Sequence, residues 1–457
     1  MNPKHLNCAR ILVDKMHNKI IKTLCDNGYN AHIVGGAVRD ILLGENPKDI
    51  DIVTNAIPEQ IISLFPENKI DLVGANFQVV MIDGIEVATY RFDCYDGFNL
   101  AETVVASTIN EDLSRRDLTI NSLAMCPVSG DIIDLFGGIN DLKNRIIKFT
   151  GNPNDRIKED PCRILRACRF LAKIDGELDE ETEFALLENR HLVKNIAPER
   201  IRIEIMKLMN CKNPSLFFEI ASDIGILELI LPNLDFCLGF DGGPHHEESV
   251  FQHCMIAGDS ISNKFPLLKL AGYLHDIGKY QSSAYDEEGF ITFHGHEKIG
   301  SEIVEQELKA LKFSNDEIEY IKNLVEFHMR SLKDISPRSM RRLISKMYEK
   351  NISHKDFLRL KIADRKANLK KEPFTFQEIK HMVKLFQIEF NAEIPNAFSI
   401  KDLTIDGNDV IQIFAIKQGP IVGNILKDIF EMVLDDPELN EREMLLVIVE
   451  GRKCRTL

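Results

Sequence analysis

The sequence predicts an α+β fold, in which an N-terminal head built on a mixed sheet is followed by helical domains. Up to about residue 145, short β-rich runs alternate with helical patterns, and Gly, Asn and Asp residues separate them. From about residue 146 onward, apolar residues recur at the three- and four-residue spacing of helices. A chain of 457 residues is too long for a single core and implies several domains.

We expect four domains along the chain. They are a mixed-sheet head, a helical neck, a histidine-rich helical domain and a helical tail, at residues 1–145, 146–240, 241–372 and 373–457. Most candidate catalytic residues fall in the head and in the histidine-rich domain. We therefore expect two separate sites of chemistry.

The composition is that of a soluble globular protein, with 44% hydrophobic residues and no apolar run of the roughly 18 residues that a membrane-spanning helix needs. Residues 1–22 combine periodic apolar positions with scattered charges, which predicts a helix rather than a signal peptide. The ten cysteines form no C-x-x-C pair, so we expect them to be reduced in a cytoplasmic protein. The net charge of −15 argues against a general nucleic-acid coat protein but leaves room for one RNA bound through a local basic surface.

Residues 30–54 have the pattern of a strand, a Gly-Gly turn, a short helix and a second strand. Gly35 and Gly36 let the backbone approach a phosphate chain, and free N–H groups at the start of the helix point toward the anion. Asp49 and Asp51 are two residues apart on the predicted second strand, so both carboxylates leave one face and suit Mg²⁺, which needs oxygen ligands. We expect a metal-dependent site for a nucleoside triphosphate. A plain turn and a solvated strand edge are the alternatives for each feature alone.

Three further segments complete the head. The run FQVVMIDGIEVATYRF predicts a β-hairpin around Asp83-Gly84, with Glu86 on its second strand. Residues 93–110 have no clear periodicity, which predicts a loop. The run EDLSRRDLTINSLAM follows, and its adjacent arginines suit a triphosphate because Arg donates in fixed bidentate pairs. A surface cluster of ion pairs is the alternative for these arginines.

The first long helical pattern is RIKEDPCRILRACRFLAKI, in which Pro161 suits a first helical turn. Asp160 and Arg163 are three residues apart, so we expect them to share a helix face, which Arg166 continues. An Asp acceptor beside an Arg donor matches the amino group and the acceptors of cytosine and adenine, whereas uracil and guanine present a carbonyl to the carboxylate. An ordinary ion pair on the helix surface is the alternative.

Together these motifs resemble the nucleotidyltransferase superfamily, in the branch that holds bacterial tRNA nucleotidyltransferases (CCA-adding enzymes) and poly(A) polymerases. The resemblance is carried by GGAVRD with KDIDIVT, by RRDLTINS, by E-D-x-x-R and by NIAPERIRIEIMKLM, in the family's order. It implies addition of C and A to the 3′ end of tRNA from CTP and ATP, without a nucleic-acid template and with Mg²⁺ as cofactor. It also implies that the helical tail binds tRNA.

The resemblance implies roles for individual residues. Asp49 and Asp51 would hold Mg²⁺, and Glu86 would be the third acidic residue beside them. Nucleotide contacts are implied for Gly35, Gly36, Arg39, Arg116, Asp117, Asn121, Asp160, Arg163, Arg166 and Arg169. The run CYDGFNLAETV lacks the arginines that the family has there. Addition of CC alone, addition of A alone and poly(A) synthesis therefore stay open.

The histidine-rich domain carries possible metal ligands in a definite order. LHDIGK, FHGHE and EFHMRS follow a first histidine and precede an aspartate in KIADRKA. This order resembles the HD superfamily of metal-dependent phosphohydrolases and implies a metal site formed by His253, His275, Asp276, His296, His328 and Asp364. Histidine with carboxylate suits Mn²⁺, Ni²⁺, Fe or Zn²⁺, and a metal-bound water is a hydrolytic nucleophile. A structural role is the alternative for any one histidine.

Two other classes of function are open. The chain could be chiefly an HD phosphohydrolase that acts on 2′,3′-cyclic phosphates or nucleotides, with the head as a binding or regulatory module. It could also be a tRNA-binding scaffold without catalysis. The two apparently complete sites favour an enzyme, and the sequence does not indicate its oligomeric state.

Overall fold

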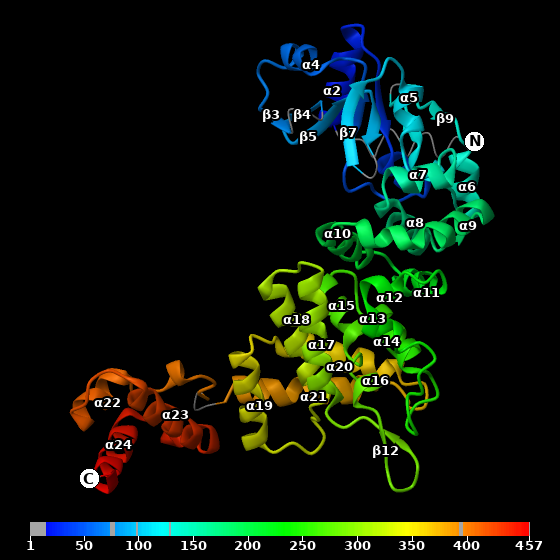
Figure 1. Ribbon diagram of the computed structural model, residues 1–457. Coiled ribbons are helices and arrows are strands. Elements are labelled where there is room, and N and C mark those ends of the chain that lie inside the picture. The colour runs from blue at the N-terminus through cyan, green and yellow to red at the C-terminus, as the bar shows by residue number, and fades with distance from the viewer. Residues whose placement is uncertain (1–14, 74–77, 97–98, 128, 393–395, 457) are drawn as a thin grey trace. The chain divides into compact units, whose positions relative to one another are not determined.

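The computed structural model describes residues 15–73, 78–96, 99–127, 129–392 and 396–456. The chain divides into two compact units, Met1–Ile230 and Leu231–Leu457 (Figure 1). The first unit contains a mixed sheet followed by helices, and the second is almost entirely helical. The predicted α+β class with a helix-rich C-terminal region is therefore confirmed, while the division into four domains stays a prediction.

The head is built on a seven-stranded sheet with the strand order β3-β4-β5-β2-β1-β8-β9. β2 and β5 run parallel and the other neighbouring pairs are antiparallel, so the sheet is mixed as predicted. The strands are β1 (Ala31–Val34), β2 (Ile52–Thr54), β3 (Ile70–Val73), β4 (Val79–Ile82), β5 (Ile85–Thr89), β8 (Leu123–Met125) and β9 (Ile132–Asp134).

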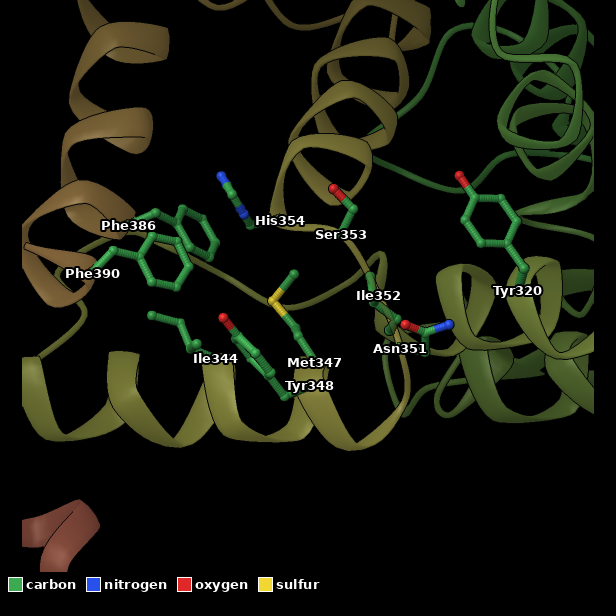
Figure 2. Close-up of a pocket in the computed structure, with 10 residues that line it drawn as sticks. All are labelled: Tyr320, Ile344, Met347, Tyr348, Asn351, Ile352, Ser353, His354, Phe386 and Phe390. Carbon is green, nitrogen blue, oxygen red and sulfur yellow. The ribbon is translucent and has the colours of Figure 1, made fainter. Parts of the chain in front are cut away.

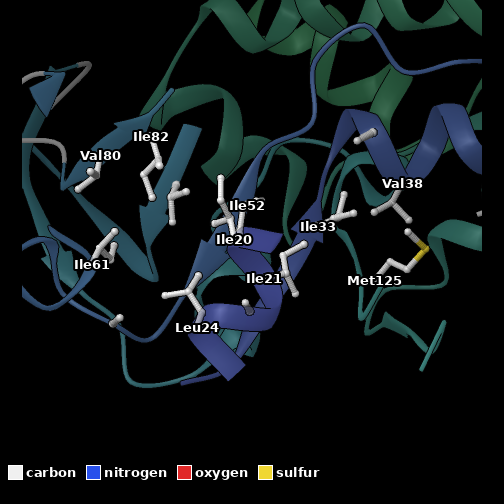
Figure 3. Packing of buried hydrophobic residues seen from close by; sticks show 14 of the residues in the cluster. Ile20, Ile21, Leu24, Ile33, Val38, Ile52, Ile61, Val80, Ile82 and Met125 are labelled. Atoms are coloured by element: carbon white, nitrogen blue, oxygen red, sulfur yellow. The ribbon is translucent and has the colours of Figure 1, made fainter. Parts of the chain in front are cut away.

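Three short helices, α2 (Lys15–Asp26), α3 (Gly36–Leu42) and α4 (Pro58–Leu64), pack against this sheet. Their buried side chains form one core with those of β1, β2 and β4 (Figure 3), including Ile20, Leu24, Ile33, Val38, Ile52, Ile61 and Val80. Each such side chain contributes about 1.5–3 kcal/mol when it is fully buried. This core fixes the ends of β1 and β2, where the Gly-Gly turn and the paired aspartates lie. The predicted N-terminal helix lies partly outside the described residues, and its described part, from Lys15, belongs to α2.

The hairpin of β4 and β5 is confirmed, and its turn residues Asp83 and Gly84 both have positive φ angles, 49° and 86°. Such angles fit the right-handed twist of paired strands. The predicted loop at residues 93–110 is wrong: β6 (Arg91–Asp96) and β7 (Asn99–Val105) form an antiparallel pair, and α5 (Ile109–Ser114) follows. We predicted a loop because the segment lacks alternating apolar residues. Main-chain hydrogen bonds hold a two-stranded ribbon together, so such an alternation is not needed.

The first unit continues with helices α6 (Gly138–Asn144), α7 (Pro153–Glu159), α8 (Cys162–Ile174), α9 (Glu180–Asn189), α10 (Pro198–Leu208), α11 (Ser215–Asp223) and α12 (Leu227–Ile230). The prediction of purely helical structure beyond the head is wrong in two places. β10 (Ile146–Ile147) pairs with β11 (Glu177–Leu178), and in the second unit β12 (Ala284–Tyr285) pairs with β13 (Ile291–Thr292). Strands of two residues are too short to leave a periodic pattern in a sequence.

In the second unit, five helices surround the histidine cluster. They are α14 (Val250–Asp259), α15 (Pro266–Leu274), α17 (His296–Ala310), α18 (Asn315–Phe327) and α20 (His354–Ala367). α19 (Pro337–Glu349) and α21 (Phe376–Phe390) pack beside them. α22 (Gly407–Phe414), α23 (Pro420–Asp435) and α24 (Arg442–Thr456) have a core of their own, and the Arg338–Asp435 ion pair links α19 to α23 at 2.5 Å.

Aromatic side chains join α19, α20 and α21 around a cavity of 510 Å³ (Figure 2). The ring of His354 stacks on the ring of Phe386, with centroids 5.2 Å apart. The centroid of the Phe390 ring lies 5.0 Å from that of His354. Because these rings contact one another, they contribute to helix packing.

Within the described ranges, no helix is both long enough and apolar enough to cross a membrane. The buried Cys162, Cys168 and Cys254 are among the free thiols.

Candidate functional site

The Gly-Gly turn of the head leaves room for one arginine. Gly35 has a φ angle of 66°, which favours glycine, and its N–H donates to the carbonyl of Leu123 at 3.0 Å. A Cβ atom at Gly35 would lie 2.8 Å from Nη1 of Arg116, closer than such atoms approach. The absence of a side chain at Gly35 therefore lets Arg116 lie directly over the turn.

Two of the three predicted acidic residues, Asp51 and Glu86, lie near this arginine, and Asp49 lies near Asp51. Asp49 and Asp51 precede β2 instead of lying on it, because the strand begins at Ile52, but the carbonyl of Asp51 still accepts from Val34 N–H at 3.2 Å. Ile52 of β2 pairs with Val87 of β5 in the parallel ladder. Asp51 and Glu86, which come directly before these two residues, are therefore adjacent to each other. The two aspartates therefore do not share the strand face that we predicted, but lie in the segment directly before β2.

The carboxylates of Asp51 and Glu86 interact electrostatically with Arg116. Loss of hydration raises the pKa of Asp51, Arg116 opposes this shift, and Asp49 adds to it. Loss of hydration and the charge of Asp51 also raise the pKa of Glu86. Both side chains are nevertheless exposed, so a cation can reach them. The donor set, carboxylate oxygens at an open edge, fits a hard divalent cation such as Mg²⁺.

A buried aspartate that we did not predict as a site residue holds the arginine in place. Asp112 is fully buried and accepts from Nη2 of Arg116 at 3.0 Å and from Nη2 of Arg115 at 2.9 Å. Burial alone would raise the pKa of Asp112, but the two arginines outweigh it and lower that pKa. The sequence did contain a signal for this role of Asp112. Arginines that follow an aspartate by three and four residues on a helix lie on the same side as that aspartate.

Four of the predicted nucleotide-binding residues form one chain of hydrogen bonds. Nη1 of Arg39 donates to Asn121 at 2.5 Å, and Nδ2 of Asn121 donates to Asp117 at 3.1 Å. Nε of Arg166 donates to the other oxygen of Asp117 at 2.6 Å. Arg166 lowers the pKa of Asp117 against the effect of burial. The chain connects α3 of the head to α8 of the neck.

The remaining donors of Arg39 are also engaged. Its Nε and Nη2 atoms donate to Asp40, and its guanidinium lies 4.8 Å from the ring centroid of Phe170. The guanidinium of Arg169 lies 4.2 Å from the same ring, and its Nε donates to the buried Glu204 at 2.5 Å. Both arginines are buried, which favours a role in fixing α3 and α8 in place.

Asp160 and Arg163 do not share a helix face, so that prediction is wrong. Asp160 ends α7 with an extended backbone, φ −150° and ψ 100°, and α8 starts only at Cys162. Pro161 explains the break, because the residue before a proline is disfavoured in the helical conformation. Asp160 instead pairs with Arg200 at 2.7 Å, and the buried Arg163 pairs with Glu159.

The second unit holds the predicted histidine cluster, with Asp276 at its centre. The Oδ1 atom of Asp276 lies 3.2 Å from Nε2 of His296 and 3.3 Å from Nε2 of His328. Oδ2 lies 3.6 Å from Nε2 of His253 and 3.5 Å from Nε2 of His275. Asp364 lies 3.1 Å from Nε2 of His253 and 3.7 Å from that of His275. The structure therefore brings all six predicted ligands together.

The orientation of the histidines prepares this cluster for a metal ion. His275, His296 and His328 each donate from Nδ1 to a main-chain carbonyl three residues earlier, at 2.8, 2.8 and 2.6 Å. Their Nε2 atoms therefore carry lone pairs that face the aspartates. The buried Nε2 of His275 has no hydrogen-bond partner. An orphaned lone pair beside two carboxylates fits a transition metal.

The cluster lies at the wall of a cavity of 630 Å³. Lysines contribute to its lining, and Nζ of Lys279 lies 2.7 Å from Asp276. Lys279 and His275 lower the pKa of Asp276, although burial acts in the opposite direction. Among the described residues, tight groups of three or more possible metal ligands occur in this unit and extend to two residues that we did not predict, His246 and Glu248.

Three family models match the chain, in the order head, neck and second unit. Residues 31–148 match the model described as "Poly A polymerase head domain". Residues 177–238 match "Probable RNA and SrmB- binding site of polymerase A", and residues 286–449 match a model of tRNA nucleotidyltransferase domain 2.

A mixed-sheet head that gathers acidic residues and an arginine at a Gly-Gly turn, followed by a helical body, defines a nucleotidyltransferase. The chain is 31% identical over 436 residues to a CCA-adding enzyme of Anoxybacillus flavithermus, an alignment that covers 93% of this chain and 94% of the relative. It is 30% identical over 341 residues to poly(A) polymerase I of Haemophilus influenzae, covering 70% and 75%. The chain belongs to the family of CCA-adding enzymes and poly(A) polymerases, the class II nucleotidyltransferases.

Solved structures have the same fold. A crystal structure of the Bacillus stearothermophilus CCA-adding enzyme in complex with CTP superposes with a TM-score of 0.66 at 24% identity, covering 96% of this chain and 97% of the other. The Thermotoga maritima CCA-adding enzyme complexed with tRNA superposes with a TM-score of 0.53 at 21% identity, covering 99% and 96%. At these identities the likeness concerns the fold.

Proposed function

We propose that this chain adds C and A nucleotides to the 3′ end of tRNA, using CTP and ATP and no nucleic-acid template. The observation that carries the proposal is the approach of Asp51, Glu86 and Arg116 at the Gly35 turn. The family membership and the similarity to CCA-adding enzymes over more than nine tenths of the chain support it. The free thiols among the described residues fit the cytoplasmic location that we propose.

In this mechanism, Asp49 and Asp51 would hold Mg²⁺ beside Glu86. When bound there, the ion would supply charge stabilisation at the attacking 3′-oxygen and at the leaving pyrophosphate. Arg116 donates to the triphosphate oxygens, and Asp112 keeps its guanidinium aimed at the turn. The bare backbone at Gly35 leaves space for the phosphate chain.

Base selection is the proposed role of the neck residues around α8. Asp160 and Arg163 present an acceptor and a donor, although each has a protein partner in the absence of nucleotide. Asp160 pairs with the half-exposed Arg200, so a cytosine or adenine amino group competes for its carboxylate with a group that water can solvate. Arg166 and Arg169 fix α8 through Asp117 and Glu204.

One assay tests the proposal and separates its alternatives. Purified protein is incubated with tRNA that ends at the discriminator base, with CTP, with ATP and with both, and the products are sized. Growth by three nucleotides with both substrates is expected. Growth that stops after two C residues, addition of one A only to tRNA ending in CC, or a long A tail would instead identify CC addition, A addition or poly(A) synthesis.

The double variant Asp160→Ala, Arg163→Ala should keep transfer but lose selectivity. A bidentate contact to a base edge contributes about 1–3 kcal/mol to discrimination, so the preference for CTP and ATP over UTP and GTP should fall roughly 10- to 100-fold. Incorporation of each nucleotide, measured as kcat/KM, checks this. The exposed pair Asp155→Ala, Lys158→Ala on α7 is the matched control, and unchanged selectivity in the test variant would refute the template role.

The variant Asp112→Asn should weaken nucleotide use, because the neutral amide no longer fixes Arg116. Hydrogen bonds to charged groups contribute about 1.5–3 kcal/mol, which corresponds to a roughly 10- to 100-fold loss in kcat/KM for CTP. Initial rates at varied CTP measure it. The exposed neighbour Glu111→Gln is the control, and equal rates in the two variants would contradict the role of Asp112.

We infer a second activity, metal-dependent hydrolysis of phosphoesters, at the histidine cluster of the second unit. The orphaned Nε2 of His275 between the buried Asp276 and the partly exposed Asp364 is the specific observation that favours it. Mn²⁺, Ni²⁺, Fe and Zn²⁺ fit the ligand set, and 2′,3′-cyclic phosphates and nucleotides are the substrates to test. If Asp49→Ala left every activity intact while His275→Ala abolished all of them, the hydrolase would be the principal function.

A further inference from the structure

One of the four clustered histidines is held differently from the others. His253 donates from Nδ1 to the carboxylate of Glu248 at 3.0 Å, whereas His275, His296 and His328 donate to main-chain carbonyls. Its Nε2 faces Asp364 at 3.1 Å. With a carboxylate at each nitrogen, His253 has an acceptor for a proton on Nδ1 and another for a proton on Nε2. Once a metal occupies the Nε2 side, Glu248 is the acceptor that keeps the remaining proton on Nδ1.

Glu248 is built to stay ionised while buried. Its side chain is 0% exposed, and its oxygens accept from Nδ1 of His246 at 2.5 Å and from Nδ1 of His253 at 3.0 Å. Main-chain N–H groups of Leu369 and Glu247 add bonds of 3.0 and 3.1 Å. Four donors therefore face the oxygens of this buried carboxylate, so Glu248 accepts from Nδ1 of His253.

The same carboxylate connects two segments that carry ligands. Glu248 lies just before α14, which holds His253, and Leu369 lies just after α20, which holds Asp364. Its bond to the Leu369 N–H therefore joins the start of one helix to the end of the other. His246, which packs edge-on against His253, belongs to the cavity lining, so the contact also reaches the substrate side.

We propose that Glu248 is a positioning residue of the second site, which fixes His253 with its proton on Nδ1 and its Nε2 lone pair toward Asp276 and Asp364. The inference rests on the metal-dependent hydrolase proposed above. A carboxylate that accepts from a ligand histidine raises the basicity of the ligand nitrogen as well as orienting it. Glu248 is thus expected to strengthen metal binding without contacting the metal.

Metal binding by the full chain tests this without any assay of hydrolysis. Metal-free protein that carries Asp51→Ala throughout, so that the proposed cation site of the head is not counted, is titrated with Mn²⁺, and free Mn²⁺ is followed by electron paramagnetic resonance. Loss of such an orienting partner typically weakens binding about 10- to 100-fold, which we expect for Glu248→Ala. Glu248→Gln should fall between it and the unchanged chain, because an amide oxygen still accepts from Nδ1 but carries no charge. The exposed neighbour Glu247→Gln should bind like the unchanged chain.

The outcomes separate the inference from the hydrolase proposal. If the unchanged chain binds Mn²⁺ and Glu248→Ala binds it equally well, the positioning role is wrong. If Glu248→Ala instead loses a whole equivalent of Mn²⁺ at unaltered affinity for the rest, Glu248 is a ligand with His246 and the inference is also overturned. If the unchanged chain binds none of the four candidate metals, the hydrolase proposal itself fails. Should Glu248→Ala not fold, the intermediate affinity expected for Glu248→Gln decides.

Discussion

Replacement of Asp51 by Ala is expected to abolish nucleotidyl transfer. Asp51 directly precedes β2, beside Glu86 of β5, and interacts electrostatically with both Asp49 and Arg116. Stabilisation of charge by a bound metal contributes several kcal/mol to the transition state, and each 1.4 kcal/mol is a factor of ten. We therefore expect kcat to fall by about 10³-fold or more, measured as incorporation of labelled CMP and AMP into tRNA at saturating nucleotide.

The control for this variant is Asp71→Ala. Asp71 is an exposed aspartate of β3 in the same sheet, and its ion pair with Lys69, at 3.1 Å, is open to water. Surface pairs of this kind contribute about 0–1 kcal/mol, so transfer should persist. Binding of Mn²⁺ in the second unit should be the same in both variants. Residual transfer by Asp51→Ala within tenfold of the unchanged chain would remove the basis of the proposed mechanism.

Local patterns predicted the parts of the head that depend on local chemistry. The Gly-Gly turn and the hairpin at Asp83 follow from backbone angles that few residues other than glycine adopt, so the sequence indicates them directly. The break between α7 and α8 was open to prediction too, because Pro161 restricts Asp160. Spacing of three residues argued for a shared face, and the proline overrode it.

Residues whose role is to hold another residue were harder to predict. Asp112 and Glu248 carry no chemistry of their own, and their importance appears only when Arg116 and His253 are seen against them. The hydrogen-bond chain through Asn121 joins residues as far as 82 positions apart, a contact that no sequence window contains. The order of the histidines did predict the cluster, because the resemblance supplied the tertiary contacts that spacing lacks.

Replacement of Asp276 by Asn is expected to eliminate the second site. Its two oxygens face the Nε2 atoms of all four histidines, so the change removes the central ligand charge. Mn²⁺ affinity should fall by at least about 100-fold, the upper end of what loss of an orienting partner alone costs, and hydrolysis of phosphoesters should be lost with it. The exposed Glu302→Gln on α17 should leave both properties unchanged.

The variant also leaves the buried Lys279 without the partner that lies 2.7 Å away, and breaking such a pair costs about 3–5 kcal/mol. A lower Tm is therefore expected and would by itself offer a trivial explanation for lost binding. Asp276→Asn combined with Lys279→Met removes the unpaired charge, so thermal unfolding should recover while Mn²⁺ binding should not. Recovery of Mn²⁺ binding together with stability would mean that Asp276 serves the packing of α15 and α17, and that the histidines bind no metal through it.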